Sequence, residues 1–117
     1  MKRYFVVEPE RVIAEDLADA IRACHPEAQV ETFRTEPDAL AALGQARPTA
    51  VILSREPEGF PQTPLGRALG EGQVAHAFLG AFDEDRSDGA VILLSPFSDQ
   101  TVADWLRRLE TRPDGAV

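Results

Sequence analysis

Ser54 is the residue whose position most strongly suggests chemistry. It directly follows a continuous apolar run, Ala50 to Leu53, and precedes charged residues. Open α/β folds place their ligands and reactive groups at the carboxyl ends of such buried strands. A serine becomes a nucleophile only beside a base, and no Gly-x-Ser-x-Gly turn surrounds this one. We therefore favour a small polar residue that ends a strand over a covalent nucleophile or an acceptor for a serine kinase.

The other residues with chemical potential are scattered along the chain. His76 lies in the strand-like segment VAHAF, which favours a packed structural histidine over a catalytic base or a phosphorelay histidine. Cys24 and His25 are adjacent, so they point in different directions on a helix and do not form a metal site. The acidic run Asp83 to Asp88 fits no calcium-loop pattern and indicates a solvated turn. Glu8 could bind a cation, but a lone carboxylate there is more often solvated or caps the following helix. We expect no catalytic residue, no metal and no cofactor.

The composition is that of one acidic globular domain. The chain has 117 residues and a formal net charge of −8. Such a charge repels nucleic acid and anionic membrane surfaces, and it favours a protein partner. The single cysteine excludes an internal disulfide, and the apolar run Tyr4 to Val7 is too short for a signal peptide or a membrane span. We expect one cytoplasmic domain, residues 1–117, with a core over about 3–110 and a flexible tail at 111–117.

Predicted strands and helices alternate along the chain. Apolar runs predict buried strands at 4–7, 50–53 and 90–94, and residues 74–80 are a further candidate. The more alternating segment 28–33 predicts a strand nearer an edge of the sheet. Helical periodicity predicts helices at 12–24 and 98–110, with a weak one at 64–72. A further helix is predicted at 35–44, with Thr35 as its N-cap and Gly44 at its end. This alternation implies a parallel sheet covered on both faces through right-handed crossovers. Between the last two strands, residues 82–89 form a polar turn, so the helix expected there is missing or shortened.

Several of these segments resemble a response-regulator receiver domain. The opening YFVVEPERVIAEDLADAI is similar to a receiver's first strand and helix, and LLSPFSDQTVADWL is similar to its fifth strand and last helix. PTAVILS stands at the place of the third strand, and AFLGAF at that of the fourth. The resemblance covers roughly residues 3 to 110. It implies a flavodoxin-like α/β fold with a doubly wound five-stranded parallel sheet in the order 2-1-3-4-5. The fourth helix would be shortened or absent, as in a compact subgroup of receivers.

The resemblance also implies that the phosphorylation site is degenerate. Ser54 takes the place of the aspartate that carries the acyl phosphate, and Ser95 that of the lysine that neutralises it. Glu8 and Pro9 match the acidic pair that holds Mg²⁺, so one carboxylate remains. Gly80 matches the threonine or serine that senses the phosphoryl group. The receiver's phosphoryl-transfer chemistry is therefore expected to be lost.

A second group of matched residues is our candidate switch and interface. Phe82 takes the place of the receiver's switch aromatic, while Pro96 and Phe97 follow the fifth strand and Trp105 lies on the last helix. Most of the apolar stripe to which Trp105 belongs, with Val102, Leu106 and Leu109, must cover the sheet. A missing helix nevertheless leaves one side of the sheet thinly covered, and uncovered apolar surface is usually claimed by a partner or a second copy.

These features together predict an atypical receiver, or pseudo-receiver, of bacterial-type two-component or phosphorelay signalling. It would not be phosphorylated on aspartate, and it would act by contact with a histidine kinase, another regulator or a second copy of itself. The alternative is a small-molecule sensor whose vacated pocket lies around Glu8, Ser54, Gly80 and Ser95. An enzyme that uses Ser54 is the third and least favoured reading.

Overall fold

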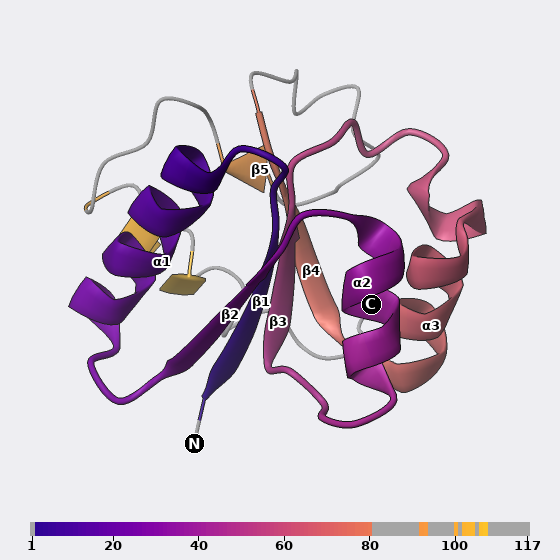
Figure 1. Cartoon of the computed structure of the whole chain (residues 1–117), viewed down its shortest axis with the longest axis horizontal. Helices are drawn as coiled ribbons and strands as arrows, with labels where there is room; N and C mark the ends of the chain where they lie inside the picture. The colour runs from indigo at the N-terminus through magenta and orange to yellow at the C-terminus, as the bar shows by residue number, and fades with distance from the viewer. Residues whose placement is uncertain (1, 81–91, 94–99, 101, 105, 108–117) are drawn as a thin grey trace.

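The computed structural model describes residues 2–80, 92–93, 100, 102–104, 106 and 107 (Figure 1). Strands alternate with helices as the sequence predicts. The elements in chain order are β1 (Arg3–Val7), α1 (Arg11–Cys24), β2 (Gln29–Phe33), α2 (Glu36–Leu43), β3 (Ala50–Leu53), the 3-10 helix η1 (Phe60–Gln62), α3 (Pro64–Gly72), β4 (Ala75–Leu79) and β5 (Ile92–Leu93).

The strands form one parallel sheet in the order β2-β1-β3-β4-β5. The order of the first four strands confirms the prediction. Of the predicted fifth strand at 90–94, the structure describes only β5, which pairs in parallel with β4. The predicted site of the shortened helix, 82–89, and the tail at 111–117 lie outside the described residues.

Helical layers cover both faces of the sheet, as expected for a doubly wound fold. Side chains alternate along a strand, so Tyr4 and Val6 of β1 face one layer while Phe5 and Val7 face the other. All four side chains are 5% exposed or less. This two-sided burial explains why β1 is a continuous apolar run in the sequence.

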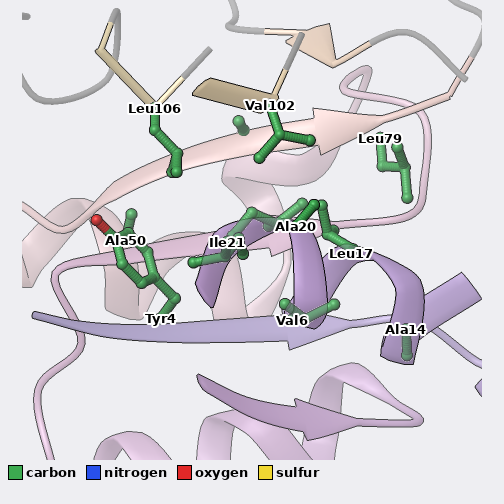
Figure 2. Close-up of a cluster of buried hydrophobic side chains, with 12 residues drawn as sticks. Tyr4, Val6, Ala14, Leu17, Ala20, Ile21, Ala50, Leu79, Val102 and Leu106 are labelled. Carbon is green, nitrogen blue, oxygen red and sulfur yellow. The ribbon is translucent and has the colours of Figure 1, made fainter. Parts of the chain in front are cut away.

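The first layer consists of α1 and of residues 102 and 106 near the end of the chain (Figure 2). Leu17 and Ile21 of α1 pack against the sheet, and Val102 and Leu106 are buried as predicted. The hydroxyl of Tyr4 is enclosed here without a hydrogen-bond partner in the described part of the chain. Burial, and to a smaller extent the nearby Cys24, raises the pKa of Tyr4 to about 12.

The second layer consists of α2, η1 and α3 (Figure 1). Phe60 of η1 and Leu69 of α3 are fully buried against Val51 and Phe78 of the sheet. The ring of Phe60 meets that of Phe78 edge-on, with centroids 5.4 Å apart. The sequence did not predict η1, although its phenylalanine is one of the largest side chains of this layer.

The helices of the second layer begin at threonine caps. The side chain of Thr35 accepts a hydrogen bond from the amide of Asp38 at 3.3 Å, and Gly44 follows the last residue of α2, so both predicted ends are confirmed. Thr63 caps α3 in the same way through the amide of Gly66 at 3.0 Å. None of the described helices is long and apolar enough to cross a membrane.

Candidate functional site

The carboxyl ends of β1, β2 and β3 meet at one edge of the sheet. Val7 pairs with Phe33 on one side and with Leu53 on the other. The backbone hydrogen bonding extends one residue beyond the strands, because the amide of Ser54 donates a hydrogen bond to the carbonyl of Val7 at 3.0 Å. The amide of Glu8 likewise donates to the carbonyl of Phe33 at 2.9 Å. Ser54 and Glu8 are thereby fixed at the same edge, as the sequence predicts.

Glu8 is buried, and its side chain accepts a hydrogen bond from the backbone. Its side chain is 5% exposed, and one carboxylate oxygen accepts a hydrogen bond from the amide of Glu10 at 2.7 Å. Glu10 is the N-cap residue of α1, so the carboxylate of Glu8 is engaged at the start of that helix, and its burial excludes the solvated alternative. Pro9 is exposed and offers no ligand oxygen from its side chain. Of Glu8 and Pro9, only Glu8 carries a carboxylate, and one of its oxygens is already engaged by a backbone amide.

Ser54 is half-buried, and its hydroxyl makes no hydrogen bond to a described residue. Gly80 directly follows β4 and carries no hydroxyl. Ser95, Phe82, Pro96, Phe97 and Trp105 lie outside the described residues. Within the described ranges, no three His, Cys, Asp or Glu residues are grouped closely enough to hold a metal ion.

His76 is a packed residue of β4. It is half-buried, and its ring lies 5.3 Å from that of Phe60 and 5.6 Å from that of Phe78, measured between centroids. These contacts agree with a structural histidine. His76 does not line the pocket at the carboxyl edge.

An open pocket of about 230 Å³ lies at this edge of the sheet. It is lined by the ends of β1 and β3 and by the start of α2. The lining residues are Val7, Pro9, Arg34, Thr35, Glu36, Leu53, Ser54 and Arg55. Of the described residues predicted around a vacated pocket, Ser54 lines this one, whereas Glu8 and Gly80 do not. Ser95 lies outside the described residues.

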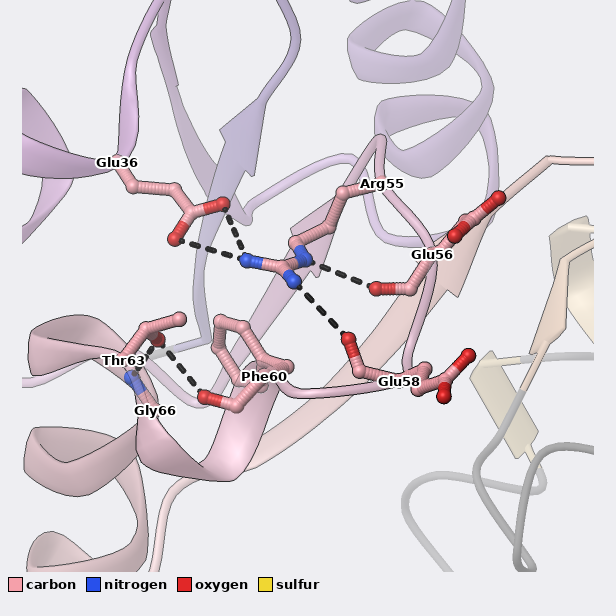
Figure 3. Close-up of polar contacts among 7 residues, drawn as sticks. All are labelled: Glu36, Arg55, Glu56, Glu58, Phe60, Thr63 and Gly66. Carbon is pink, nitrogen blue, oxygen red and sulfur yellow. Dashed lines mark hydrogen bonds and ion pairs between the residues drawn. The ribbon is translucent and has the colours of Figure 1, made fainter.

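Arg55 lines the pocket and makes several polar contacts, which Figure 3 shows. Its Nη1 contacts both carboxylate oxygens of Glu36, at 3.4 and 3.1 Å. Its Nε donates to the carbonyl of Glu56 at 2.8 Å, and its Nη2 to that of Glu58 at 3.2 Å. The guanidinium also lies 5.2 Å from the ring centre of Phe60. A single side chain thus joins α2 to the loop between β3 and η1.

The sequence did not identify Arg34, Glu36 or Arg55 as site residues. Thr35 was recognised only as a helix cap. Arg34 and Thr35 follow the last residue of β2, just as Ser54 and Arg55 follow β3. The same reasoning that singled out Ser54, a polar residue at the carboxyl end of a strand, would have found all of these except Glu36.

The chain resembles solved structures, although it matches no known family by sequence. No protein-family model and no curated protein sequence matches the chain. Several solved structures do match it over nearly their whole length. SdrG from Sphingomonas melonis Fr1 is 28% identical with a TM-score of 0.72, and the match covers 94% of this chain and 97% of that one. The BeF3-activated conformation of SdrG from Pseudomonas melonis Fr1 is 26% identical with a TM-score of 0.73, over 92% and 94% of the two chains.

A response regulator from Thermotoga maritima gives a similar result at lower identity. It is 22% identical with a TM-score of 0.75, and the match covers 93% of this chain and 97% of that one. The strand order and the two helical layers agree with these matches. The chain therefore has the receiver-domain fold of response regulators.

Proposed function

We propose that this protein is an atypical receiver of two-component or phosphorelay signalling that is not phosphorylated on aspartate. It acts through contact with a protein partner, and it has no enzymatic activity of its own. The observation that carries the proposal is the end of β3. In a receiver this strand would present the phosphoacceptor aspartate, but here it presents Ser54. The neutral hydroxyl of Ser54 makes no hydrogen bond to a base among the described residues, and so it is not activated as a nucleophile.

The described neighbours of Ser54 support the same function. Mg²⁺ is usually held by one or two carboxylates in near-ideal octahedral geometry. Here one oxygen of Glu8 is engaged by the amide of Glu10, and Pro9 supplies no carboxylate. Gly80 has no hydroxyl with which to sense a phosphoryl group. Two further described positions, Pro9 and Gly80, thus lack a group that phosphoryl transfer requires, so the loss is not confined to Ser54.

Arg55 supports a single fixed arrangement of this edge. Its contacts with Glu36 and with the carbonyls of Glu56 and Glu58 form within the protein itself. The loop after β3 is therefore held without an added phosphoryl group. Such a domain presents a constant surface to its partner instead of one that depends on phosphorylation.

The partner we propose is a histidine kinase, another regulator or a second copy of the chain, met in the cytoplasm. A net charge of −8 favours a partner with a basic surface. The fold neighbours named above include a response regulator, which supports a signalling role. Sedimentation velocity tests whether two copies of the chain form a dimer. The dissociation constant of that dimer should be the same with and without Mg²⁺ and beryllofluoride.

An amide NMR titration with Mg²⁺ and beryllofluoride, an acyl-phosphate mimic, tests the central proposal. SdrG is a suitable positive control because its BeF3-activated conformation is a matching structure. We expect no saturable, Mg²⁺-dependent shifts at Glu8, Ser54 or Gly80. Such shifts with a defined affinity would show that phosphoryl chemistry is retained.

Restoring the acceptor provides a second test. Ser54→Asp should not become phosphorylated by acetyl phosphate, because Pro9 still supplies no metal ligand and Ser95 no positive charge. Incorporation is measured by intact-protein mass spectrometry under conditions that label a functional receiver. Efficient labelling of the variant would contradict the proposal that the site has lost more than its aspartate.

The pocket favours a second candidate function, which is the sensing of a small molecule. Its volume of about 230 Å³ lies below the roughly 300–1,000 Å³ of pockets for drug-sized ligands, so it fits only a small ligand. The titrations described below test this candidate separately.

A further inference from the structure

The pocket lies where an open α/β sheet is best suited to hold a ligand. In the strand order 2-1-3-4-5, the winding of the chain reverses between the first and third strands, and ligands bind outside the carboxyl ends of the strands at that point. Val7 ends β1 and Leu53 ends β3, and both line the pocket. Its location therefore follows from the topology, independently of any phosphorylation chemistry.

The polar groups of the pocket fall into two sets. The carboxylate of Glu36 is engaged through both oxygens by Nη1 of Arg55, and that pair is only 28% and 27% exposed. The side chain of Arg34 is exposed and makes no hydrogen bond or ion pair with a described residue. The hydroxyl of Ser54 has no partner within the same part of the chain. The hydroxyl oxygen of Thr35 accepts a hydrogen bond from the backbone amide of Asp38, so the O–H group of Thr35 is still free to donate one.

The uncommitted side-chain groups are therefore all able to donate hydrogen bonds. Arg34 offers a planar fork of N–H donors, and Ser54 and Thr35 each offer a hydroxyl. Among the described lining residues, the one carboxylate is that of Glu36, which is paired with Arg55. The described lining thus carries one unmatched positive charge in a protein whose net charge is −8.

We propose that this pocket binds a small oxyanion, a carboxylate or a phosphate group, with Arg34 as its charged donor and with Ser54 and Thr35 as neutral donors. Arginine suits such a ligand because its fork can bind two oxygens at once in a charge-assisted manner. The binding needs neither an aspartate nor Mg²⁺. It goes beyond the proposed contact with a protein partner, and the two proposals can fail separately.

Amide NMR titrations at constant ionic strength and without Mg²⁺ test this inference. The probes are inorganic phosphate in one series and succinate in the other, so that the two sources of the oxyanion are distinguished. We expect saturable shifts confined to the residues around Arg34, Thr35 and Ser54, with a stronger response to one of the two probes. In a repeat of each titration at a higher fixed salt concentration, the affinity for the probe should be lower, since the site depends on an exposed charge.

Matched charge variants make the titration decisive. Arg34→Gln should weaken binding of the preferred probe at least tenfold, and Arg34→Lys should weaken it less because it keeps the charge but loses the fork. Arg67→Gln is the control, because it removes the same charge from an exposed position on α3 outside the pocket. Arg34 is exposed, so neither variant at that position should alter the fold.

Three results would overturn the inference: no saturable shift with either probe, shifts spread over the surface, or equal affinities for wild type and Arg34→Gln. None of them bears on phosphorylation, because neither Mg²⁺ nor an acyl-phosphate mimic is present. Conversely, a Mg²⁺-dependent response to beryllofluoride contradicts the proposed function and leaves the oxyanion site intact.

Discussion

Two glycines of α3 should respond to the same substitution in opposite ways. A Cβ atom built on Gly66 would lie 1.9 Å from the carbonyl oxygen of Phe60 and 2.8 Å from its carbonyl carbon. Real Cβ atoms essentially never approach other heavy atoms more closely than 3.0 Å. A Cβ on Gly70 would have no neighbour within 4 Å. We therefore predict that Gly66→Ala destabilises the protein and that Gly70→Ala stabilises it.

The backbone around Gly66 has little freedom to move away. Phe60 is fully buried, and its carbonyl accepts hydrogen bonds from the amide of Thr63 at 2.9 Å and from its hydroxyl at 2.7 Å. That hydroxyl oxygen in turn accepts from the amide of Gly66 (Figure 3). Making room for a methyl group would separate η1 from α3 and disturb the helix cap.

The sizes of the two effects follow from opposing terms. An alanine gains about 1 kcal/mol over a glycine inside a helix, whereas overpacking costs about 1–3 kcal/mol and a lost cap about 1 kcal/mol. Because the clash is with backbone, we take the upper part of that range, and Gly66→Ala should lower the free energy of unfolding by about 2 kcal/mol. Gly70→Ala, which meets nothing, should raise it by about 0.5–1 kcal/mol.

Urea unfolding followed by far-UV circular dichroism measures both variants under identical conditions. The two midpoints should lie on opposite sides of the wild-type midpoint, with unchanged m-values. Thermal unfolding should show the same order, at about 4 °C for each kcal/mol in a domain of this size. A Gly66→Ala variant as stable as wild type would refute the close packing of α3 against η1.

Two further variants test polar side chains that are buried or partly buried, Tyr4 and Arg55. Tyr4→Phe removes a buried hydroxyl that has no described partner, and it should raise the free energy of unfolding by about 1 kcal/mol in urea titrations. Because the pKa of Tyr4 is raised to about 12, wild type should also lose stability as the pH rises from about 10 to 12, and Tyr4→Phe should lose less; identical pH profiles would contradict this. Arg55→Gln should lower the free energy of unfolding by about 1.5–3 kcal/mol, because it removes a charge that is bonded to Glu36 and to two carbonyls. The matched control, Arg11→Gln, breaks an exposed pair with Glu15 and should cost no more than about 0.5 kcal/mol, so equal losses in the two variants would argue against the Arg55 contacts.

The sequence predicted the elements whose determinants are local. β3 matches the run Ala50 to Leu53 residue for residue, because a strand buried on both faces must be apolar throughout. α2 begins after Thr35 and ends before Gly44 for equally local reasons of capping. α3 was predicted only as a weak helix because of its glycines. At Gly66, however, the glycine is required by contact with Phe60, which the pattern along the helix does not reveal.

The site was predicted in part, for a related physical reason. Placing Ser54 and Glu8 at one edge needs only the strand order, which the alternation of elements supplies. The burial of Glu8 depends on the amide of Glu10 folding back toward it. One side of the pocket is formed where Arg55 reaches Glu36, nineteen positions away in the chain. Such contacts between elements are set by side-chain geometry in three dimensions, and no local pattern encodes them.

The contacts of Arg55 have a consequence for how fast and how tightly the pocket can bind. They make its wall preorganised, so a ligand does not have to order the loop after β3 when it arrives. Little conformational entropy is then lost on binding beyond that of the exposed Arg34 side chain and the ligand itself. Association should proceed in a single step without a slow closing motion, and the structure with and without ligand should be nearly the same. The occupied and empty forms would then differ chiefly in surface charge, and a partner could read that difference without any movement of the fold.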